Sequence, residues 1–188
     1  MTGVLVAVVG PSGAGKDTLM DAARAALEGD ARVVFLRRAI TRPAEAGGED
    51  HLPLSRGAFV AEREAGRFAL WWDAHGLLYG IPRDALDSAL AAGRTAVANL
   101  SRRALADAAA HYPLRVLEIT APSEVLAARL AARGREDAAD VARRLSREVP
   151  LPAGLTVDRV MNDGTVEAGA ERVLLALRGV REAAVPAA

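Results

Sequence analysis

The chain has 188 residues, 51% of them hydrophobic, and its 24 basic and 24 acidic side chains give a formal net charge of zero. This length suits one compact domain, and the balanced charge gives no electrostatic reason to expect nucleic acid as a partner. Cysteine is absent, which excludes disulfide bonds and thiol chemistry, and no apolar run approaches the length of a membrane span. A cytoplasmic protein without a membrane partner is therefore expected.

Predicted strands and helices alternate along most of the chain. Strands are predicted at 4–9, 33–37, 95–98, 114–119 and 155–161, and helices at 16–27, 83–92, 102–110, 122–133, 137–148 and 166–178. This alternation predicts an α/β fold with a parallel sheet flanked by helices. Residues 39–81 interrupt the alternation and predict an inserted flap, which contains a hairpin with its turn near His75 and Gly76.

A glycine-rich segment, GPSGAGKDTL at residues 10–19, lies between the first strand and the first helix. It nearly matches the phosphate-binding pattern G-x-x-x-x-G-K-[ST], in which backbone N–H groups and a helix N-terminus hold phosphate oxygens. Lys16 is the only lysine among the 24 basic residues, and a compact ammonium fits between phosphate oxygens better than a guanidinium does. We predict a nucleotide-phosphate site made of Gly10, Pro11, Ser12, Gly13, Ala14, Gly15, Lys16, Asp17 and Thr18.

Asp17 departs from that pattern, because a serine or threonine is expected after the lysine. Its carboxylate can replace the missing hydroxyl as a ligand of Mg²⁺, an ion that readily takes carboxylate oxygens. The third predicted core strand ends in Asn99, where a second, metal-supporting acid is expected. We interpret the acid gained at position 17 as compensation for the acid missing at position 99.

The wider pattern resembles the guanylate kinase family of P-loop phosphotransferases. The matching pieces include AITRPAEAGGED at 39–50, HGLLYG at 75–80, RLAARGRE at 129–136, RRLSRE at 143–148 and MNDG at 161–164. The resemblance implies a nucleoside monophosphate kinase-like fold with a core at 1–38 and 82–180. It also implies an acceptor-binding flap at 39–81 and a lid at about 133–145 that closes over ATP.

The departures from guanylate kinases concern base recognition. The second arginine of the family's T-R-x-x-R is missing after Arg42, and Ile81 replaces the hydroxyl residue expected after Tyr79-Gly80. A pocket that selects one base needs hydrogen-bonding groups, whereas here mainly the phosphate-binding groups are kept. In these respects the chain is similar to the ribose 1,5-bisphosphate phosphokinases of bacterial phosphonate breakdown, which also carry GPSGxGKD. This resemblance implies transfer of the γ-phosphoryl group of ATP, with Mg²⁺, to the 1-phosphate of ribose 1,5-bisphosphate.

The resemblance also suggests roles for individual residues. Lys16 and the lid residues Arg133, Arg135 and Arg144 are expected to stabilise the transferred phosphoryl group, and Asn162 is expected near the adenine. Arg38, Arg42 and Tyr79 are expected to hold acceptor phosphates, and Glu49, Asp50 or His51 to bond ribose hydroxyls. Asn99 joins the acceptor-binding candidates, because the family has acids at the end of this strand. Arg129, Arg143 and Arg147 are interpreted as a solvated helix face.

Alternative functions remain open at this point. They are a guanylate kinase, a gluconate-type sugar kinase, and a non-catalytic guanylate kinase-like module that binds phosphopeptides. The loop, its lysine and the lid arginines argue against the non-catalytic module. A small sugar phosphate is the expected partner, and the sequence leaves a homodimer open.

Overall fold

The main sheet consists of five parallel strands in the order β2-β7-β1-β8-β9. The protein is described by a computed structural model that covers residues 3–46, 49–132 and 149–183. The strands are β1 (Val4–Val9), β2 (Val33–Phe35), β7 (Thr95–Asn99), β8 (Leu114–Thr120) and β9 (Val157–Met161). Because the strands are parallel, their carboxyl ends meet at one edge of the sheet, the usual place for a site in this fold class.

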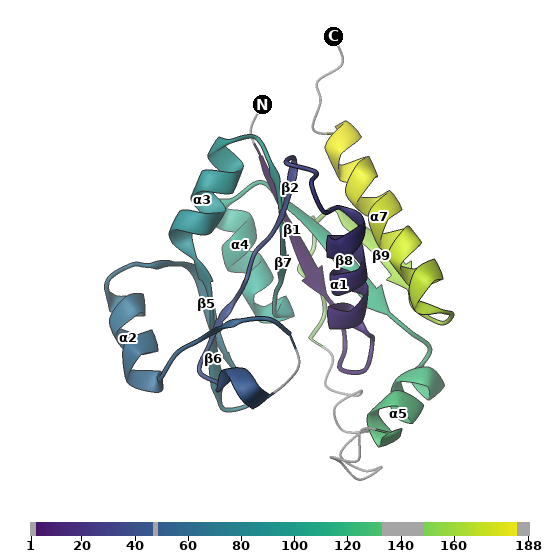
Figure 1. The fold of residues 1–188 in the computed structure, drawn as a ribbon, viewed down its shortest axis with the longest axis horizontal. Helices are drawn as coiled ribbons and strands as arrows, with labels where there is room; N and C mark the ends of the chain where they lie inside the picture. The colour runs from purple at the N-terminus through teal and green to yellow at the C-terminus, as the bar shows by residue number, and fades with distance from the viewer. Residues whose placement is uncertain (1–2, 47–48, 133–148, 184–188) are drawn as a thin grey trace.

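Helices cover both faces of the main sheet (Figure 1). One face of β1, with Val6 and Val8, packs against α1 (Lys16–Ala26), α5 (Ser123–Ala132) and α7 (Val166–Ala183). The alternate residues of β1 pack against α3 (Arg83–Ala91) and α4 (Leu105–His111), which follows the short 3₁₀ turn η2 (Arg102–Ala104). A strand buried on both faces reads as a continuous apolar run, which is why VLVAVV forms β1.

A second sheet of four short strands forms the flap, in the order β4-β3-β6-β5. Its strands are β3 (Ala39–Ile40), β4 (Leu52–Pro53), β5 (Phe68–Ala74) and β6 (Leu77–Pro82), and it also carries η1 (Ala44–Ala46) and α2 (Arg56–Glu64). The expected hairpin is present as β5 and β6. Its turn has positive φ angles of 54° at His75 and 75° at Gly76, as a two-residue hairpin turn of the primed type requires.

The flap hairpin and the main sheet share one apolar core. Leu70, Trp72 and Ile81 from the hairpin are buried in the same cluster as residues of β1, β7, α3 and α4. The flap is therefore packed onto the main sheet through side chains rather than attached only by its connecting segments. Phe59, Phe68 and Leu78 form a second, smaller core inside the flap.

Most predicted elements are present with shifted ends. The strand predicted at 33–37 ends at Phe35, and the strand predicted at 155–161 begins only at Val157, after Gly154 with a φ of 80°. The last helix continues to Ala183, beyond the predicted 178. Three flap elements, β3, β4 and α2, were not predicted, and the helix predicted at 137–148 lies outside the described residues.

The two ends of the described chain lie at the same edge of the main sheet. β1 begins and α7 ends at the edge opposite the strands' carboxyl ends (Figure 1). Within the described ranges, no helix combines the length and the apolar character that a membrane crossing requires.

Candidate active site

The glycine-rich loop follows β1 directly and depends on its glycines for packing as well as for conformation. Gly10, Gly13 and Gly15 have positive φ angles of 152°, 85° and 81°. A Cβ atom on Gly10 would stand 1.9 Å from the carbonyl oxygen of Ile119, and one on Gly15 would stand 2.5 Å from Nδ2 of Asn162. These contacts are too short for any side chain, so the loop fits between β8 and Asn162 only with glycine at both positions.

Lys16 begins α1 and its ammonium lies against the loop. Its Nζ donates hydrogen bonds to the carbonyl oxygens of Gly10 at 2.9 Å and Pro11 at 3.0 Å. Burial lowers the pKa of Lys16 from 10.5 to about 8, and the positive charges of Arg38 and Arg102 act in the same direction against the acids Asp17 and Glu49. The loop therefore holds a poorly solvated cation at the N-terminus of α1, which is a strong site for an anion.

Asp17 and Asn99 are in direct contact, which the sequence did not indicate. The Asn99 side chain donates from Nδ2 to Oδ1 of Asp17 at 3.0 Å, and Asn99 is buried at the end of β7. The parallel pairing of Val8 with Asn99 places this residue beside the loop. Asp17 and Thr18 are themselves exposed. Asn99 thus fixes one carboxylate oxygen of Asp17 and leaves the other available to a ligand.

Arg38 and Glu49 face each other across the flap. The guanidinium of Arg38 donates from both Nε and Nη2 to the carboxylate of Glu49. It also lies over the ring of Tyr79, 4.9 Å from the centroid, and Tyr79 stacks on Trp72. Burial raises the pKa of the Tyr79 phenol, while Arg38 and Arg42 oppose that shift. Tyr79 therefore keeps its proton at neutral pH and can donate a hydrogen bond.

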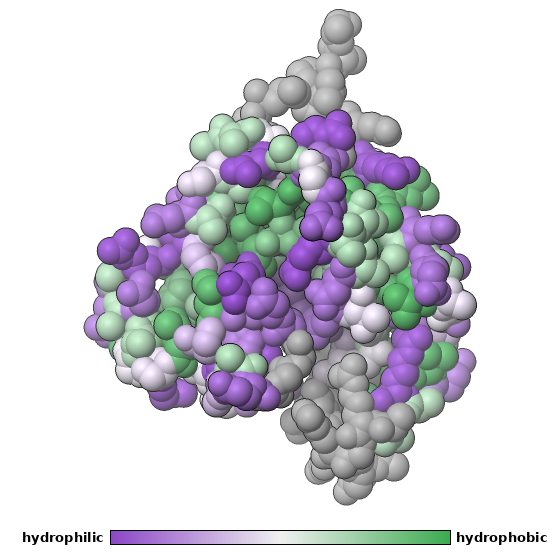
Figure 2. All heavy atoms as spheres, viewed as in Figure 1, coloured by the Kyte–Doolittle hydropathy of each residue, from purple (hydrophilic) through white to green (hydrophobic). Residues whose placement is uncertain are grey.

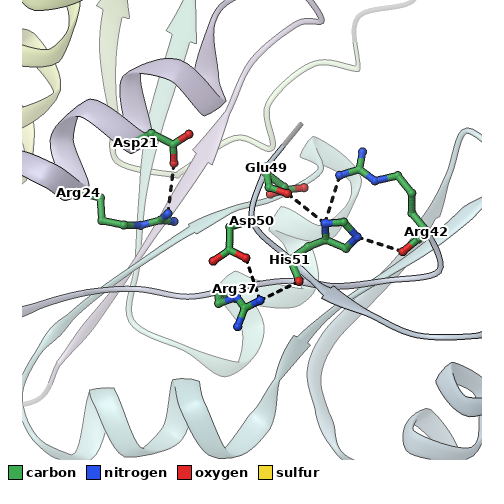
Figure 3. Close-up of polar contacts among 7 residues, drawn as sticks. All are labelled: Asp21, Arg24, Arg37, Arg42, Glu49, Asp50 and His51. Carbon is green, nitrogen blue, oxygen red and sulfur yellow. Dashed lines mark hydrogen bonds and ion pairs between the residues drawn. The ribbon is translucent and has the colours of Figure 1, made fainter. Parts of the chain in front are cut away.

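Arg42, His51 and Asp50 are connected by a second set of polar contacts (Figure 3). Nδ1 of His51 lies 3.0 Å from the carbonyl oxygen of Glu49, and Nε2 lies 3.1 Å from the carbonyl oxygen of Arg42. Arg42 Nη2 is 3.4 Å from His51 Nδ1. Asp50 is exposed and forms an ion pair with Arg37 at 2.8 Å.

A small hollow separates α1 from the flap. Hydrophilic residues cover this part of the surface (Figure 2). Its lining residues come from α1, the end of β2, the flap and the end of β7, and they are Asp17, Met20, Asp21, Arg24, Leu36, Glu49, Asp50 and Asn99. A larger, open cavity of about 480 Å³ lies at the tip of the flap beside Thr41, Arg42 and Arg56. None of its lining residues belongs to the phosphate loop, so of these two hollows in the described part of the chain, the one beside α1 joins loop and flap.

Two arginines near the loop were not identified from the sequence. Arg129 was interpreted as part of a solvated face, and this interpretation is wrong. Its Nη1 is buried without a hydrogen-bond partner in the described part of the chain, and it lies 4.0 Å from where a Cβ of Gly15 would stand. Arg102 donates to Glu118 at 2.9 Å and lies close enough to Lys16 to lower its pKa. The positions of both arginines depend on how α5 and η2 pack beside the loop, and helical spacing in the sequence does not reveal this packing.

The remaining predicted site residues fall into two groups. Arg133, Arg135 and Arg144 lie outside the described residues, as does the lid predicted at about 133–145. Asn162 is buried against the loop, where its Nδ2 donates to the carbonyl oxygen of Ala14 at 2.8 Å. Asn162 therefore supports the loop backbone, and its contact with adenine stays a prediction.

Comparisons with known proteins match the chain to one family model and to ribose 1,5-bisphosphate phosphokinases. A family model described as an AAA domain matches residues 5–149. The ribose 1,5-bisphosphate phosphokinase PhnN of Brucella melitensis is 53% identical over 169 residues, which are 89% of this chain and 87% of that protein. The bifunctional ribose 1,5-bisphosphokinase-thymidine phosphorylase of Azorhizobium caulinodans is 52% identical over 178 residues, but the chain spans only 26% of its length.

A solved structure extends the likeness of the fold. The guanylate kinase from Anaplasma phagocytophilum superposes with a TM-score of 0.69 at 18% sequence identity, over 96% of this chain and 87% of that one. At this identity the match shows the fold, and the expected guanylate kinase-like architecture with a parallel sheet flanked by helices is confirmed.

Proposed function

The chain belongs to the AAA domain family and to the family of ribose 1,5-bisphosphate phosphokinases, and we propose that it phosphorylates ribose 1,5-bisphosphate with ATP. An oxygen of the acceptor's 1-phosphate attacks the γ-phosphorus of ATP. The bond between the γ-phosphorus and the β,γ-bridging oxygen breaks, and ADP leaves with the electron pair. The products are 5-phosphoribosyl 1-diphosphate and ADP. Because the attacking group is an ionised phosphate, the reaction needs no general base.

One observation carries the choice of acceptor: the space between the hairpin and the main sheet is filled by apolar side chains. Leu70 and Ile81 are buried there, only 1% and 0% exposed, in the same cluster as Leu100. The polar group at the end of β7, Asn99, donates to Asp17. A site that selected a purine would present unpaired hydrogen-bonding groups to the base edge. The hollow between α1 and the flap is lined mainly by acids, which can bond ribose hydroxyls, and Arg38 and Arg42 lie beside the flap residues Tyr79 and His51, where they suit the phosphates of the acceptor.

The donor nucleotide is proposed to bind at the glycine-rich loop. Backbone N–H groups of the loop and of the first turn of α1 bind its phosphates, and Lys16 exchanges its carbonyl partners for β- and γ-phosphate oxygens. Arg129 fits the same phosphates, because its buried and unpartnered Nη1 lies over Gly15. An unsatisfied buried guanidinium N–H is costly, and a phosphate oxygen would satisfy it.

Asp17 is the proposed Mg²⁺ ligand of the protein. The described residues contain no group of three or more histidine, cysteine, aspartate or glutamate side chains that could hold a metal. This fits Mg²⁺, which commonly binds one or two carboxylates and completes its shell with phosphates and water. When bound, Mg²⁺ neutralises charge on the transferring phosphoryl group. Asn99 orients the Asp17 carboxylate, and the exposed Thr18 hydroxyl is available beside it.

The acceptor is proposed to bind between α1 and the flap. Glu49 lines the hollow there and is the proposed ligand of a ribose hydroxyl. Arg42, which lines the open cavity of the flap, and the protonated Tyr79 hydroxyl are the proposed ligands of the acceptor's phosphates. Arg38 already donates two hydrogen bonds to Glu49, so it orients that carboxylate and contributes positive charge near the acceptor. Arg133, Arg135 and Arg144 remain predicted ligands of the transferring phosphoryl group. A homodimer and a cytoplasmic location also stay predictions.

The test compares two acceptors in parallel reactions. The protein is incubated with Mg-ATP and either ribose 1,5-bisphosphate or GMP, and both reactions are followed by phosphorus NMR. We expect a diphosphate at C1 of the ribose and no GDP. If GDP forms and the bisphosphate is not phosphorylated, the chain is a guanylate kinase and the proposed function is wrong. Turnover of either acceptor excludes the non-catalytic module, whereas a melting temperature that does not rise with Mg-ATP would favour it.

A further inference from the structure

His51 is placed between two residues that the proposed function assigns to the acceptor. It is buried, with 5% of its surface exposed, and stands immediately before β4. The ring lies between the residues that follow β3 and those that precede β4. It contacts Arg42 at one end of this connection and Glu49 at the other (Figure 3). The position of this ring therefore affects both ends at once.

Both ring nitrogens of His51 face backbone carbonyl oxygens. Nδ1 lies 3.0 Å from the oxygen of Glu49, and Nε2 lies 3.1 Å from the oxygen of Arg42. The side chain of Arg42 approaches Nδ1 as well, at 3.4 Å. The ring's polar atoms are thus engaged by the segment itself, so a direct bond from His51 to a ribose hydroxyl, which the sequence suggested, would require one of these contacts to break.

The backbone around His51 is held by Arg37 and by the ladder between β3 and β4. Arg37 donates from Nη2 to the carbonyl oxygen of His51 at 2.9 Å and pairs with Asp50 at 2.8 Å. The next residue, Leu52, donates from its backbone nitrogen to the carbonyl oxygen of Arg38 at 2.8 Å in the ladder between β3 and β4. The ring therefore projects from a fixed point of the sheet toward Arg42 and Glu49.

Glu49 is consequently held at two places. His51 contacts its backbone carbonyl, and Arg38 holds its carboxylate. Arg42 is likewise contacted at its carbonyl and at its guanidinium by the same imidazole. We propose that His51 is a positioning residue, which sets the separation of Arg42 and Glu49 so that both can bind one acceptor molecule. This inference rests on the proposed function, because it takes these two residues as acceptor ligands.

Kinetics of His51→Phe, His51→Asn and His51→Gln test the proposal. Phenylalanine keeps a flat ring but removes both ring nitrogens, and we expect the KM for ribose 1,5-bisphosphate to rise about tenfold to a hundredfold, with the KM for ATP unchanged. The amide of asparagine can replace Nδ1 toward Glu49, and that of glutamine can replace Nε2 toward Arg42. Each should restore part of the loss. Equal rises in both KM values, or no rescue by either amide, would overturn the proposal.

A double-mutant cycle with Arg42→Ala separates positioning from direct contact. If His51 acts partly through Arg42, His51→Phe should raise the acceptor KM by a smaller factor in the Arg42→Ala background than in the wild type. Fully multiplicative effects would indicate an independent contact and overturn the proposal. Phe59→Leu is the matched control, because Phe59 is buried in the flap's own core. It should lower the melting temperature and leave the acceptor KM unchanged; a rise equal to that of His51→Phe would overturn the proposal.

Amide hydrogen exchange gives a readout that does not depend on turnover. Loss of the ring's hydrogen bonds in His51→Phe should accelerate exchange in residues 42–46 and 49–51, and leave β1 and α1 unchanged. Unchanged exchange in those residues overturns the positioning role even if activity falls. If the wild type does not phosphorylate ribose 1,5-bisphosphate while the variant still exchanges faster, the proposed function fails and the structural role of His51 stands.

Discussion

Two properties of Lys16 bear on its proposed role at the phosphate site. Its ammonium lies on the loop carbonyls of Gly10 and Pro11, and its pKa is lowered to about 8, mainly by burial. A group in this state is partly neutral in mildly alkaline solution. Nucleotide phosphates supply negative charge beside it and so raise its pKa again.

Binding of Mg-ATP should therefore take up protons at pH 8.5. At that pH Lys16 is largely neutral in the free protein, whose Lys16 pKa is about 8, and charged in the complex. ATP affinity should fall with rising pH above 8, by at most about tenfold per pH unit. Calorimetry in two buffers of different ionisation enthalpy measures the uptake. The uptake should shrink at pH 7, where Lys16 is already charged; its absence at pH 8.5 would contradict the role of Lys16.

Residues of the candidate site could be proposed from the sequence where the signal is local. The sequence from Gly10 to Thr18 predicts a phosphate-binding loop, because the spacing of its glycines and lysine lies within one continuous segment. The contact between Asp17 and Asn99 and the position of Arg129 over Gly15 were not predictable. Both depend on the register of neighbouring strands and the packing of a helix, which bring together residues about eighty or more positions apart.

At the scale of elements, the hairpin of the flap is fitted closely around Gly80. A Cβ on Gly80 would stand 2.6 Å from the ring of Phe68, which stacks on Phe59 with centroids 4.5 Å apart. Gly80→Ala should therefore destabilise the protein by about 1–3 kcal/mol through overpacking. Gly57→Ala is the matched control: it lies in α2 with open space around it and should stabilise by about 0.5–1 kcal/mol.

Thermal unfolding of the two glycine variants measures these effects. Opposite shifts of the melting temperature are expected, downward for Gly80→Ala and upward for Gly57→Ala. An unchanged melting temperature for Gly80→Ala would mean that the Phe68 ring moves aside without cost.

Elements of the main sheet were predictable, whereas most of the flap was not. β1, α1, β7 and β8 have apolar patterns that identify them without tertiary information. β3 and β4 contain two residues each, too few for any periodicity. β4 is formed by its pairing with β3, and β3 by its pairing with both β4 and β6. Ser55 is the N-cap of α2, and its side chain accepts a hydrogen bond from the nitrogen of Ala58. That cap was a readable signal, but it was hidden in a segment interpreted as irregular.

For the whole molecule, the shared core predicts cooperative unfolding. Both tryptophans, Trp71 and Trp72, lie in β5 of the flap, whereas most helices lie on the main sheet. Trp72 is buried in the cluster that also contains Leu5 and Leu86. Tryptophan fluorescence and far-ultraviolet circular dichroism should therefore report the same melting temperature, as expected for a two-state transition. A lower midpoint by fluorescence would mean that the flap unfolds separately.

The direction of the strands in the main sheet determines how the domain can be joined to another polypeptide. The reactive groups gather at the carboxyl ends of the strands, while the start of β1 and the end of α7 lie at the opposite edge (Figure 1). A polypeptide joined at either of these ends would start from the edge opposite the proposed substrate sites. The fold can thus serve as a building block in gene fusions: a second catalytic unit can be appended without blocking the entry of nucleotide or acceptor.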